Sequence, residues 1–316
     1  MKPFAFVFPG QGSQAVGMLD AWGDHPAVAA TLREASDALG EDVARLIKEG
    51  PKEALALTTN TQPAMLVAGV AAYRAWRAEG GDAPAVVAGH SLGEYSALVA
   101  SGVLTLADAA PLVRFRAQAM QEAVPVGAGA MAAILGMEAQ QVIDGCAEAL
   151  RSFGTNTAEV VEVANFNDPG QTVIAGSKAA VEKACLVLKA NGAKRALPLP
   201  VSAPFHSSLM KPAAERLKEK LAATSFASPH IPVINNIEAK SESDPVRIRA
   251  ALYQQAFGPV RWVECVGAIQ ARGVGNVIEC GPGKVLAGLC KRVAPELTVA
   301  ALYDRTTLDE VKGLLS

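Results

Sequence analysis

The chain has 316 residues, of which 50% are hydrophobic and 19% are charged, so it can bury the core of one large domain or of a domain with an insert. A formal net charge of −2 at pH 7 argues against broad electrostatic attraction to nucleic acid or to a membrane, and we expect neither as a partner. No apolar run is long enough to span a bilayer, and we expect no signal peptide.

The numbers and positions of cysteine and histidine indicate the compartment of the protein and whether it binds a metal. Five scattered cysteines without a Cys-x-x-Cys pair indicate free thiols in a reducing compartment, so we expect a cytoplasmic protein. Four widely separated histidines form no metal-ligand pattern, and we expect no metal.

The first part of the chain alternates strands with helices. Apolar runs predict buried strands at Phe4–Phe8 and at residues 85–88. Alanine-rich amphipathic stretches predict helices at residues 26–40, 42–49, 62–79, 94–100 and 105–123. This alternation is typical of an α/β domain with a largely parallel sheet.

Residues 127–200 follow a different order. The pattern predicts strands at residues 131–135, 160–164, 172–175 and 195–199, with helices at 138–153 and 178–191. The order β-α-β-β-α-β is the ferredoxin-like signature, and glycines and prolines mark both edges. We therefore expect a small ferredoxin-like domain at 127–200, inserted into a large α/β-hydrolase-like domain made of 1–126 and 201–316.

The last part returns to the large domain. Helices are predicted at residues 211–223, 247–255 and 260–270, a strand at 233–237, and a last core strand at 277–280. Residues from both ends of the chain would then build one sheet.

Residues 89–93 read Gly-His-Ser-Leu-Gly, a Gly-x-Ser-x-Gly motif between a predicted strand and a predicted helix. Glycines two positions either side of Ser91 remove the Cβ clashes of a sharp turn. The serine then lies at a helix N-terminus, where backbone N–H groups favour negative charge. This arrangement predicts acyl chemistry at Ser91, although a capping serine in a Gly-rich turn is the simpler interpretation.

A serine nucleophile needs a base, and four histidines are available. His25 and His230 adjoin prolines in apparent surface turns, and His90 neighbours the serine on a turn that points adjacent side chains apart. His206 follows Ser91 in chain order, as the histidine of α/β-hydrolase-like enzymes does. We predict His206 as the base.

An acidic third member is not evident. Asp168 lies upstream of the histidine in an Asn-Asp-Pro-Gly sequence that is typical of a turn. A backbone carbonyl can also orient an imidazole, so the prediction is a dyad.

The Gly10-Gln11-Gly12 loop after the first strand has two interpretations. It fits the looser dinucleotide-binding fingerprint, but a second strand ending in an acidic residue is missing. Alternatively, the Gln11 N–H faces the Leu92 N–H and the two bind an oxyanion. The second interpretation completes the elbow and is preferred.

Two arginines lie in the helix predicted at 105–123. A buried arginine needs a carboxylate or phosphate partner, and its fork binds a carboxylate through two hydrogen bonds. By spacing alone, either Arg114 or Arg116 could be the buried one.

These motifs together resemble one family, the malonyl-CoA:acyl carrier protein transacylases of fatty acid synthesis. The matching segments run in order through nearly the whole chain: 6–14 (FVFPGQGSQ), 89–98 (GHSLGEYSAL), 120–125 (MQEAVP), 163–167 (VANFN), 169–176 (PGQTVIAG), 202–207 (SAPFHS) and 281–286 (GPGKVL). Residues 117–119, Ala-Gln-Ala, replace the commoner Gly-Lys-Phe of the family.

The resemblance assigns roles to individual residues. It implies Ser91 as nucleophile, His206 as base held by the main-chain carbonyl of Gln255, and the N–H groups of Gln11 and Leu92 as the oxyanion hole. It further implies Arg116 as the ligand of the substrate carboxylate and Phe205 as the bulky residue associated with malonyl rather than methylmalonyl selection.

The implied reaction is malonyl transfer from malonyl-CoA to the phosphopantetheine thiol of acyl carrier protein, by a ping-pong mechanism through malonyl-serine and without a cofactor. The alternatives are a serine thioesterase or esterase, an acyltransferase of a polyketide pathway, and an inactive docking module. We expect a monomer with a basic rim for the acidic carrier protein. Candidate rim residues are Lys189, Lys194, Arg195, Lys284, Lys291 and Arg292.

Overall fold

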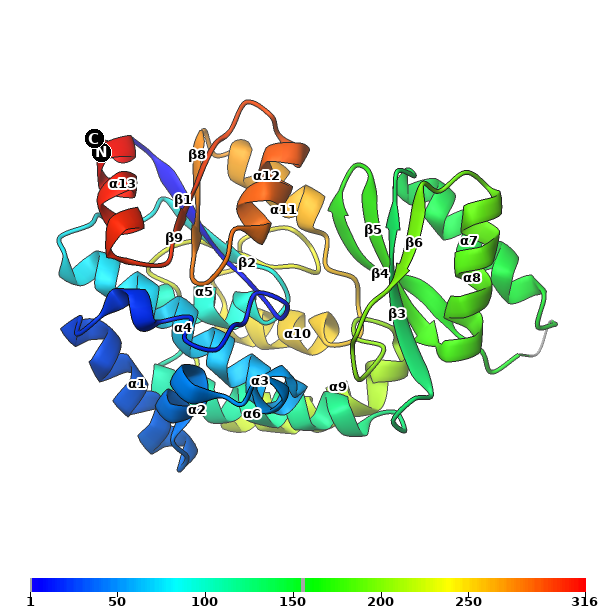
Figure 1. The fold of residues 1–316 in the computed structure, drawn as a ribbon, viewed down its shortest axis with the longest axis horizontal. Coiled ribbons are helices and arrows are strands. Elements are labelled where there is room, and N and C mark those ends of the chain that lie inside the picture. Colours follow the sequence, from blue (N-terminus) through cyan, green and yellow to red (C-terminus); the bar gives the residue numbers. More distant parts are fainter. Residues whose placement is uncertain (1, 155–156) are drawn as a thin grey trace.

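The computed structural model describes residues 2–154 and 157–316, and it contains two β-sheets in separate parts of the molecule (Figure 1). The larger sheet has five parallel strands in the order β7-β2-β1-β8-β9. Its strands are β1 (Phe4–Phe8), β2 (Val86–Gly89), β7 (Val233–Ile234), β8 (Asn276–Cys280) and β9 (Thr298–Leu302). Both ends of the chain therefore contribute to one sheet, as predicted, and Lys2 N–H donates to Leu315 O (2.8 Å).

The central strand β1 is buried on both faces because helices cover both. Successive side chains of a strand point to opposite faces. Phe4, Phe6 and Phe8 pack into one core cluster, whereas Ala5 and Val7 pack into another on the opposite face. A continuous apolar run is typical of such a doubly covered parallel strand.

Helices of the larger part lie on either side of this sheet (Figure 1). The first core cluster includes residues of α1 (Pro26–Leu39), α2 (Val43–Glu49), α3 (Lys52–Ala56), α4 (Thr58–Ala78), α5 (Gly93–Ala100), α6 (Leu106–Glu122), α9 (Lys211–Ala223), α10 (Pro245–Gln255) and α13 (Arg305–Leu315). The second includes residues of α11 (Trp262–Gln270) and α12 (Val285–Val293). Two short 3₁₀ turns, η1 (Asp20–Trp22) and η2 (Ser208–Met210), contribute Trp22 and Met210 to the first cluster.

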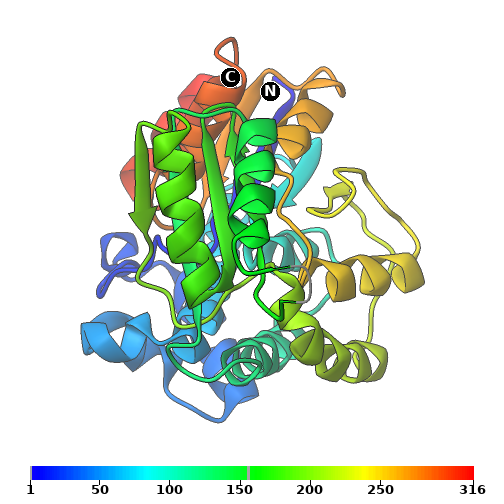
Figure 2. The same ribbon diagram turned by 90° about the vertical axis from the view of Figure 1, so that its right-hand side faces the viewer.

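The smaller sheet is antiparallel, with the strand order β4-β5-β3-β6. Its elements are β3 (Gly129–Leu135), α7 (Ala139–Arg151), β4 (Val161–Asp168), β5 (Gln171–Ser177), α8 (Lys178–Ala190) and β6 (Arg195–Pro198). Figure 2 shows α7 and α8 side by side over one face of this sheet. The expected mixed α/β class, with a mostly parallel sheet and a separate antiparallel one, is confirmed.

The edge strand β4 connects the small sheet to the larger part. Phe166 N–H donates to Val260 O and Val260 N–H donates to Ala164 O, both at 2.9 Å. Farther along β4, Asp168 Oδ2 accepts from Arg292 Nε of α12 at 2.6 Å. These bonds fix the small sheet beside the carboxyl ends of β1 and β2.

Several element predictions were wrong or incomplete in the last third of the chain. The strand at 277–280 is not the last, because β9 follows it as the sheet edge and is covered by α13. The strand predicted at 233–237 ends at Ile234, because Asn235 and Asn236 leave it to make side-chain hydrogen bonds. The helix predicted from 260 begins at Trp262, because Val260 pairs with β4. Helices α12 and α13 were not predicted.

Within residues 2–154 and 157–316, no helix is long and apolar enough to cross a membrane. In the same ranges, no group of three or more His, Cys, Asp or Glu side chains is arranged to hold a metal ion.

Close packing of β1, β2 and α5 requires glycine at two positions. A Cβ on Gly89 would lie 1.9 Å from the carbonyl carbon of Gly93, and one on Gly93 would lie 2.0 Å from Phe8 O. Both obstacles are backbone atoms that cannot rotate away, so the turn between β2 and α5 depends on these glycines.

Gly93→Ala is expected to lower the free energy of unfolding by about 3 kcal/mol or more, because the new methyl overlaps the main chain of β1. Gly267→Ala, in α11, is the matched control, since its Cβ meets nothing within 4 Å. Because alanine favours a helix over glycine, Gly267→Ala is expected to raise the free energy of unfolding by roughly 0.5–1 kcal/mol. Urea unfolding of both variants measures the two values, and a Gly93→Ala protein as stable as the parent would contradict the packing argument.

Candidate active site

Ser91 lies at the tip of the turn between β2 and α5, with a left-handed backbone (φ 53°) that non-glycine residues rarely adopt. The side chain of Asn236 holds this turn from both sides. Its Oδ1 accepts from Ser91 N–H at 2.7 Å and its Nδ2 donates to Gly89 O at 2.7 Å. The strained serine is thus fixed by bonds to a residue from a distant loop.

Ser91 and His206 lie in direct contact. Ser91 Oγ is 2.7 Å from His206 Nε2, and His206 Nδ1 is 2.9 Å from Gln255 O and 3.2 Å from Gly258 O. Two carbonyl oxygens at Nδ1 require a proton there, so Nε2 is left to accept the serine proton. The arrangement can run nucleophilic catalysis without an acidic third member.

Burial, and after it the Arg116 cation, lower the pKa of His206 to about 3. The two backbone carbonyls oppose this shift only partly. His206 is therefore a neutral imidazole near pH 7, which is the form that takes a proton from a hydroxyl.

The structure separates the two arginines that the sequence left open. Arg116 is 1% exposed and faces the site, whereas Arg114 donates to Glu41 and Asn60 near the surface. The Arg116 guanidinium donates to Gln62 Oε1 (2.7 Å), Gln255 Oε1 (3.0 Å) and Ser91 Oγ (3.2 Å). These partners are amide and hydroxyl oxygens, so the positive charge is not neutralised by a carboxylate in direct contact.

Three side chains that sequence reasoning missed support this site: Asn236, Glu94 and the Gln255 amide. The Glu94 carboxylate is buried and accepts from Asn236 N–H and from Gln255 Nε2, each at 2.9 Å. Burial raises the pKa of Glu94 to about 7, although the hydrogen bonds and Arg116 oppose the shift. The sequence did carry a signal for Glu94, because it is an acidic residue in the first turn of α5, three positions after the serine, and that turn is buried.

Gln11 and Leu92 both line the pocket, and each has a backbone N–H group. The main-chain and side-chain hydrogen bonds found within the described residues use neither of them as a donor. The Ser91 N–H, by contrast, is already bound to Asn236. Two unengaged N–H donors from residues that line the same pocket as a serine hydroxyl can stabilise an oxyanion.

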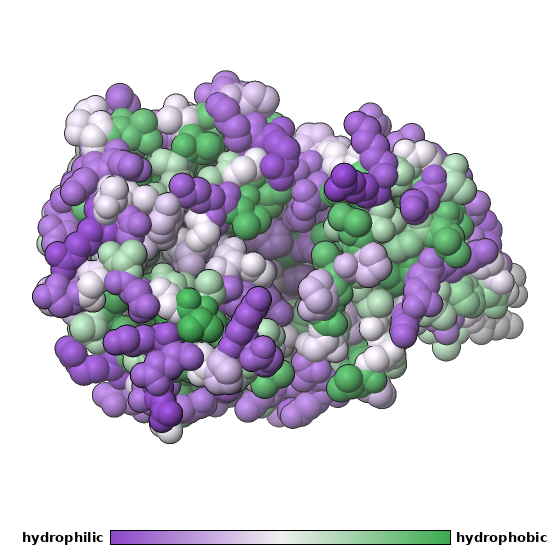
Figure 3. All heavy atoms as spheres, viewed as in Figure 1, coloured by the Kyte–Doolittle hydropathy of each residue, from purple (hydrophilic) through white to green (hydrophobic). Residues whose placement is uncertain are grey.

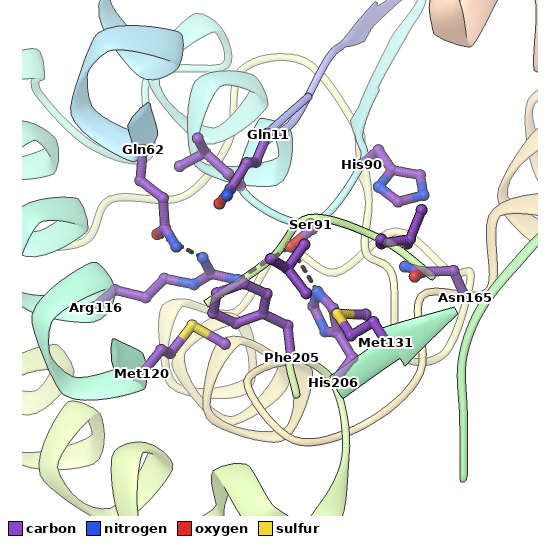
Figure 4. Close-up of a pocket in the computed structure, with 13 residues that line it drawn as sticks. Gln11, Gln62, His90, Ser91, Arg116, Met120, Met131, Asn165, Phe205 and His206 are labelled. Atoms are coloured by element: carbon purple, nitrogen blue, oxygen red, sulfur yellow. Dashed lines mark hydrogen bonds between the residues drawn. The ribbon is translucent and has the colours of Figure 1, made fainter. Parts of the chain in front are cut away.

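A pocket of about 140 Å³ connects these groups, and Figure 3 shows the surface hollowed between the two parts of the molecule. In Figure 4, Arg116 and Gln62 approach Ser91 from one side and His206 from another, while the Phe205 ring lies beside them. The apolar part of the wall is formed by Leu92, Met120, Met131, Leu199, Val201 and Phe205. Such a lining excludes water from a small acyl group.

The remaining candidates lie outside the dyad. His90 Nε2 contacts Asn167 Oδ1 at 2.9 Å and burial lowers the pKa of its imidazole. Asp168 pairs with Arg292 and is not a partner of His206. All six residues predicted for the basic rim are exposed: Lys189, Lys194, Arg195, Lys284, Lys291 and Arg292.

Comparison with known proteins defines the class of the protein first. Residues 5–306 match the family described as acyl transferase domain. The malonyl CoA-acyl carrier protein transacylase of Escherichia coli (strain K12) is 52% identical, with 98% of each chain covered. An acyl-carrier-protein S-malonyltransferase structure from Burkholderia pseudomallei is 60% identical with a TM-score of 0.95, covering 98% of this chain and 99% of that one.

A second similar structure is a malonyl-transacylase in complex with a type II polyketide synthase acyl carrier protein. It is 49% identical, with a TM-score of 0.94 and 98% of each chain covered. The chain belongs to the malonyl CoA-acyl carrier protein transacylase family.

The lowered pKa of His206 has a measurable consequence for stability. An unfolded chain protonates this histidine near its ordinary value of 6.5, whereas the folded protein keeps it neutral to about pH 3. The unfolded state binds more protons in that interval, so the stability contributed by His206 is lost as the pH falls below 6.5.

We expect Arg116→Met to raise the pKa of His206 while leaving it below 6.5, because the larger cause, burial, remains. NMR titration of the imidazole Cε1–H signal in both proteins measures this pKa. An unchanged value in Arg116→Met would show that the cation does not act on the imidazole.

Proposed function

We propose that this protein transfers the malonyl group of malonyl-CoA to the phosphopantetheine thiol of an acyl carrier protein, and that it supplies fatty acid synthesis. The observation that carries the proposal is the buried Arg116 beside Ser91 Oγ, with its charge left for a ligand carboxylate. A guanidinium binds a carboxylate through two parallel hydrogen bonds. The names of the similar proteins support the same substrate and acceptor.

In the first half of the proposed reaction, His206 Nε2 takes the proton from Ser91 Oγ as the oxygen attacks the thioester carbonyl of malonyl-CoA. Arg116 holds the free carboxylate of the malonyl group. The N–H groups of Gln11 and Leu92 bind the tetrahedral oxyanion. The intermediate collapses by breaking the C–S bond, and the CoA thiolate receives the proton from His206.

In the second half, His206 takes the proton of the phosphopantetheine thiol, and the thiolate attacks the malonyl ester on Ser91. The new C–S bond forms, the Oγ–C bond breaks, and the serine oxygen recovers the proton from His206. The Gln255 carbonyl keeps the imidazole in the required tautomer throughout. This chemistry needs no cofactor, so we propose none.

The two parts of the molecule are proposed as domains: an α/β-hydrolase-like one of 1–126 and 201–316, and a ferredoxin-like one of 127–200. The β-α-β-β-α-β order and the antiparallel strand order β4-β5-β3-β6 support the second name. Five free cysteines among the described residues support a cytoplasmic location. We also propose a monomer, a basic rim that docks the carrier protein, and a role for the pocket-lining Phe205 in acyl selection.

A second candidate, malonyl supply to a polyketide carrier protein, is favoured by the similar malonyl-transacylase solved with such a carrier. Both candidates share the acyl-enzyme and differ only in the acceptor. The ratio of kcat/KM for the two classes of carrier protein separates them.

Intact-mass spectrometry tests the acyl-enzyme directly. After mixing with malonyl-CoA, the protein is expected to gain the mass of one malonyl group and to lose it when holo carrier protein is added. Ser91→Ala should gain nothing. Loss of the added mass without an acceptor would indicate a hydrolase, and a parent protein that never gains mass would indicate a docking module.

Arg116→Ala is expected to lower malonyl transfer relative to acetyl transfer by roughly 10- to 100-fold, the value of a hydrogen bond to a charged group. Arg114→Ala, two residues away on the same helix and paired with Glu41, is the matched control and should leave the ratio unchanged. Steady-state rates with both acyl-CoA substrates give the ratio. Equal losses for the two substrates in Arg116→Ala would remove this arginine from substrate binding.

A further inference from the structure

The Glu94 carboxylate has no part in the proposed reaction, although it is buried directly beneath the site. A buried carboxylate is unfavourable unless its oxygens accept strong hydrogen bonds. Glu94 Oε2 accepts two, from Asn236 N–H and from Gln255 Nε2. The bond from Asn236 supports the loop that holds the serine turn. The bond from Gln255 connects Glu94 to Arg116, because the Gln255 amide also contacts the guanidinium.

The amide of Gln255 has only one orientation that satisfies its neighbours. Its Nε2 lies 2.9 Å from Glu94 Oε2 and 3.0 Å from Ser91 O. The carbonyl oxygen can only accept, and Oε2 also receives the Asn236 N–H and is therefore an acceptor here. Its Oε1 then faces Arg116 Nη2 at 3.0 Å, which can only donate. An amide turned the other way would place a donor against the guanidinium and an acceptor against the carboxylate.

The guanidinium of Arg116 is thereby oriented by neutral oxygens. Gln62 Oε1 fixes one terminal nitrogen and Gln255 Oε1 the other, while the Tyr95 ring lies under the guanidinium carbon at 5.4 Å. Amide oxygens accept hydrogen bonds without cancelling the charge. The nearest buried carboxyl group on this side, Glu94, does not touch the guanidinium and reaches it only through Gln255.

We propose that Glu94, acting through the side-chain amide of Gln255, is a positioning residue that holds Arg116 in its carboxylate-binding orientation and so sets the preference for malonyl over uncharged acyl groups. The inference rests on the proposed function, because it concerns the acyl group that Arg116 receives. It assigns to Gln255 a side-chain role that is separate from its main-chain contact with His206.

Two isosteric substitutions test this arrangement, one by removing the ionisable carboxyl group at position 94 and the other by placing a carboxylate at position 255. Glu94→Gln keeps the shape but exchanges the carboxyl group for a neutral amide, so the hydrogen bond that anchors Gln255 Nε2 on this side weakens while the bond to Ser91 O remains. We expect the malonyl-to-acetyl ratio of kcat/KM to fall about tenfold, the equivalent of one hydrogen bond to a charged group. The loss should appear in the KM for malonyl-CoA. Gln255→Glu places a carboxylate directly on Arg116 and should lower the ratio at least as much.

The matched control is Glu279, a second buried glutamate whose pKa burial raises to about 7. It lies in β8 and accepts from Ala287 N–H at 2.8 Å, at the start of α12. Glu279→Gln is expected to change stability and leave the malonyl-to-acetyl ratio as in the parent. A general effect of removing a buried charge would instead move the ratio in both variants.

A double-mutant cycle separates positioning from structural damage. If Glu94 acts through Arg116, then Glu94→Gln added to Arg116→Ala causes no further fall in the ratio. Additive effects, or equal losses for malonyl and acetyl in the single variant, overturn the proposal. If Glu94→Gln does not fold, Gln255→Met and Gln255→Glu decide, and an unchanged ratio in both overturns it.

Malonyl uptake by the parent protein separates a failure of the proposed function from a failure of the positioning role. A parent that takes up no malonyl group removes the proposed function and this inference together. A parent that takes up malonyl, with a ratio indifferent to Glu94 and to the Gln255 side chain, removes only the positioning role.

Discussion

The contact between the end of β1 and the start of α5 is the constraint on which the rest of the site depends. The backbone of Gly93 packs against Phe8 O so closely that no side chain fits between them. Because β1 and β2 are parallel neighbours, their carboxyl ends open at the same edge of the sheet. The loop after β1 therefore brings Gln11 into the same pocket as Ser91, and the two N–H groups proposed to bind the oxyanion, those of Gln11 and Leu92, come from different loops.

Parts of this arrangement could be predicted from local sequence and parts could not. The elbow glycines, the apolar β1 and the loop histidine each carry a signal within a few residues, and so did the order of elements in residues 127–200. The choice between Arg114 and Arg116 depends on which side of α6 packs against α4 and α10, and the spacing of residues along one helix does not predict this. The resemblance to a family, rather than spacing, identified Arg116.

Long-range polar contacts account for what the sequence did not reveal. Asn236 follows a strand of only two residues and bonds to a turn 145 residues earlier. Its Asn-Asn dipeptide is typical of any surface loop, so nothing local marks it as the support of the serine. The edge strand β9 was missed for a related reason, because three of its five side chains are exposed or partly exposed and its apolar pattern is weaker than that of β1.

The charges of the site explain why a carboxylate-bearing acyl group suits this enzyme. Arg116 acts on both reacting groups: it donates to Ser91 Oγ and it helps to keep the pKa of His206 low. A carboxylate bound to the guanidinium offsets that positive field, because opposite charges in contact cancel at a distance. The imidazole then becomes a stronger base at the moment when its substrate is in place. An acyl group without a carboxylate fills the same apolar pocket but leaves the cation, and its effect on the base, unchanged. In the proposed reaction, acyl selectivity and the basicity of His206 are therefore coupled through one guanidinium, and this coupling requires that the partners that orient Arg116 carry no charge.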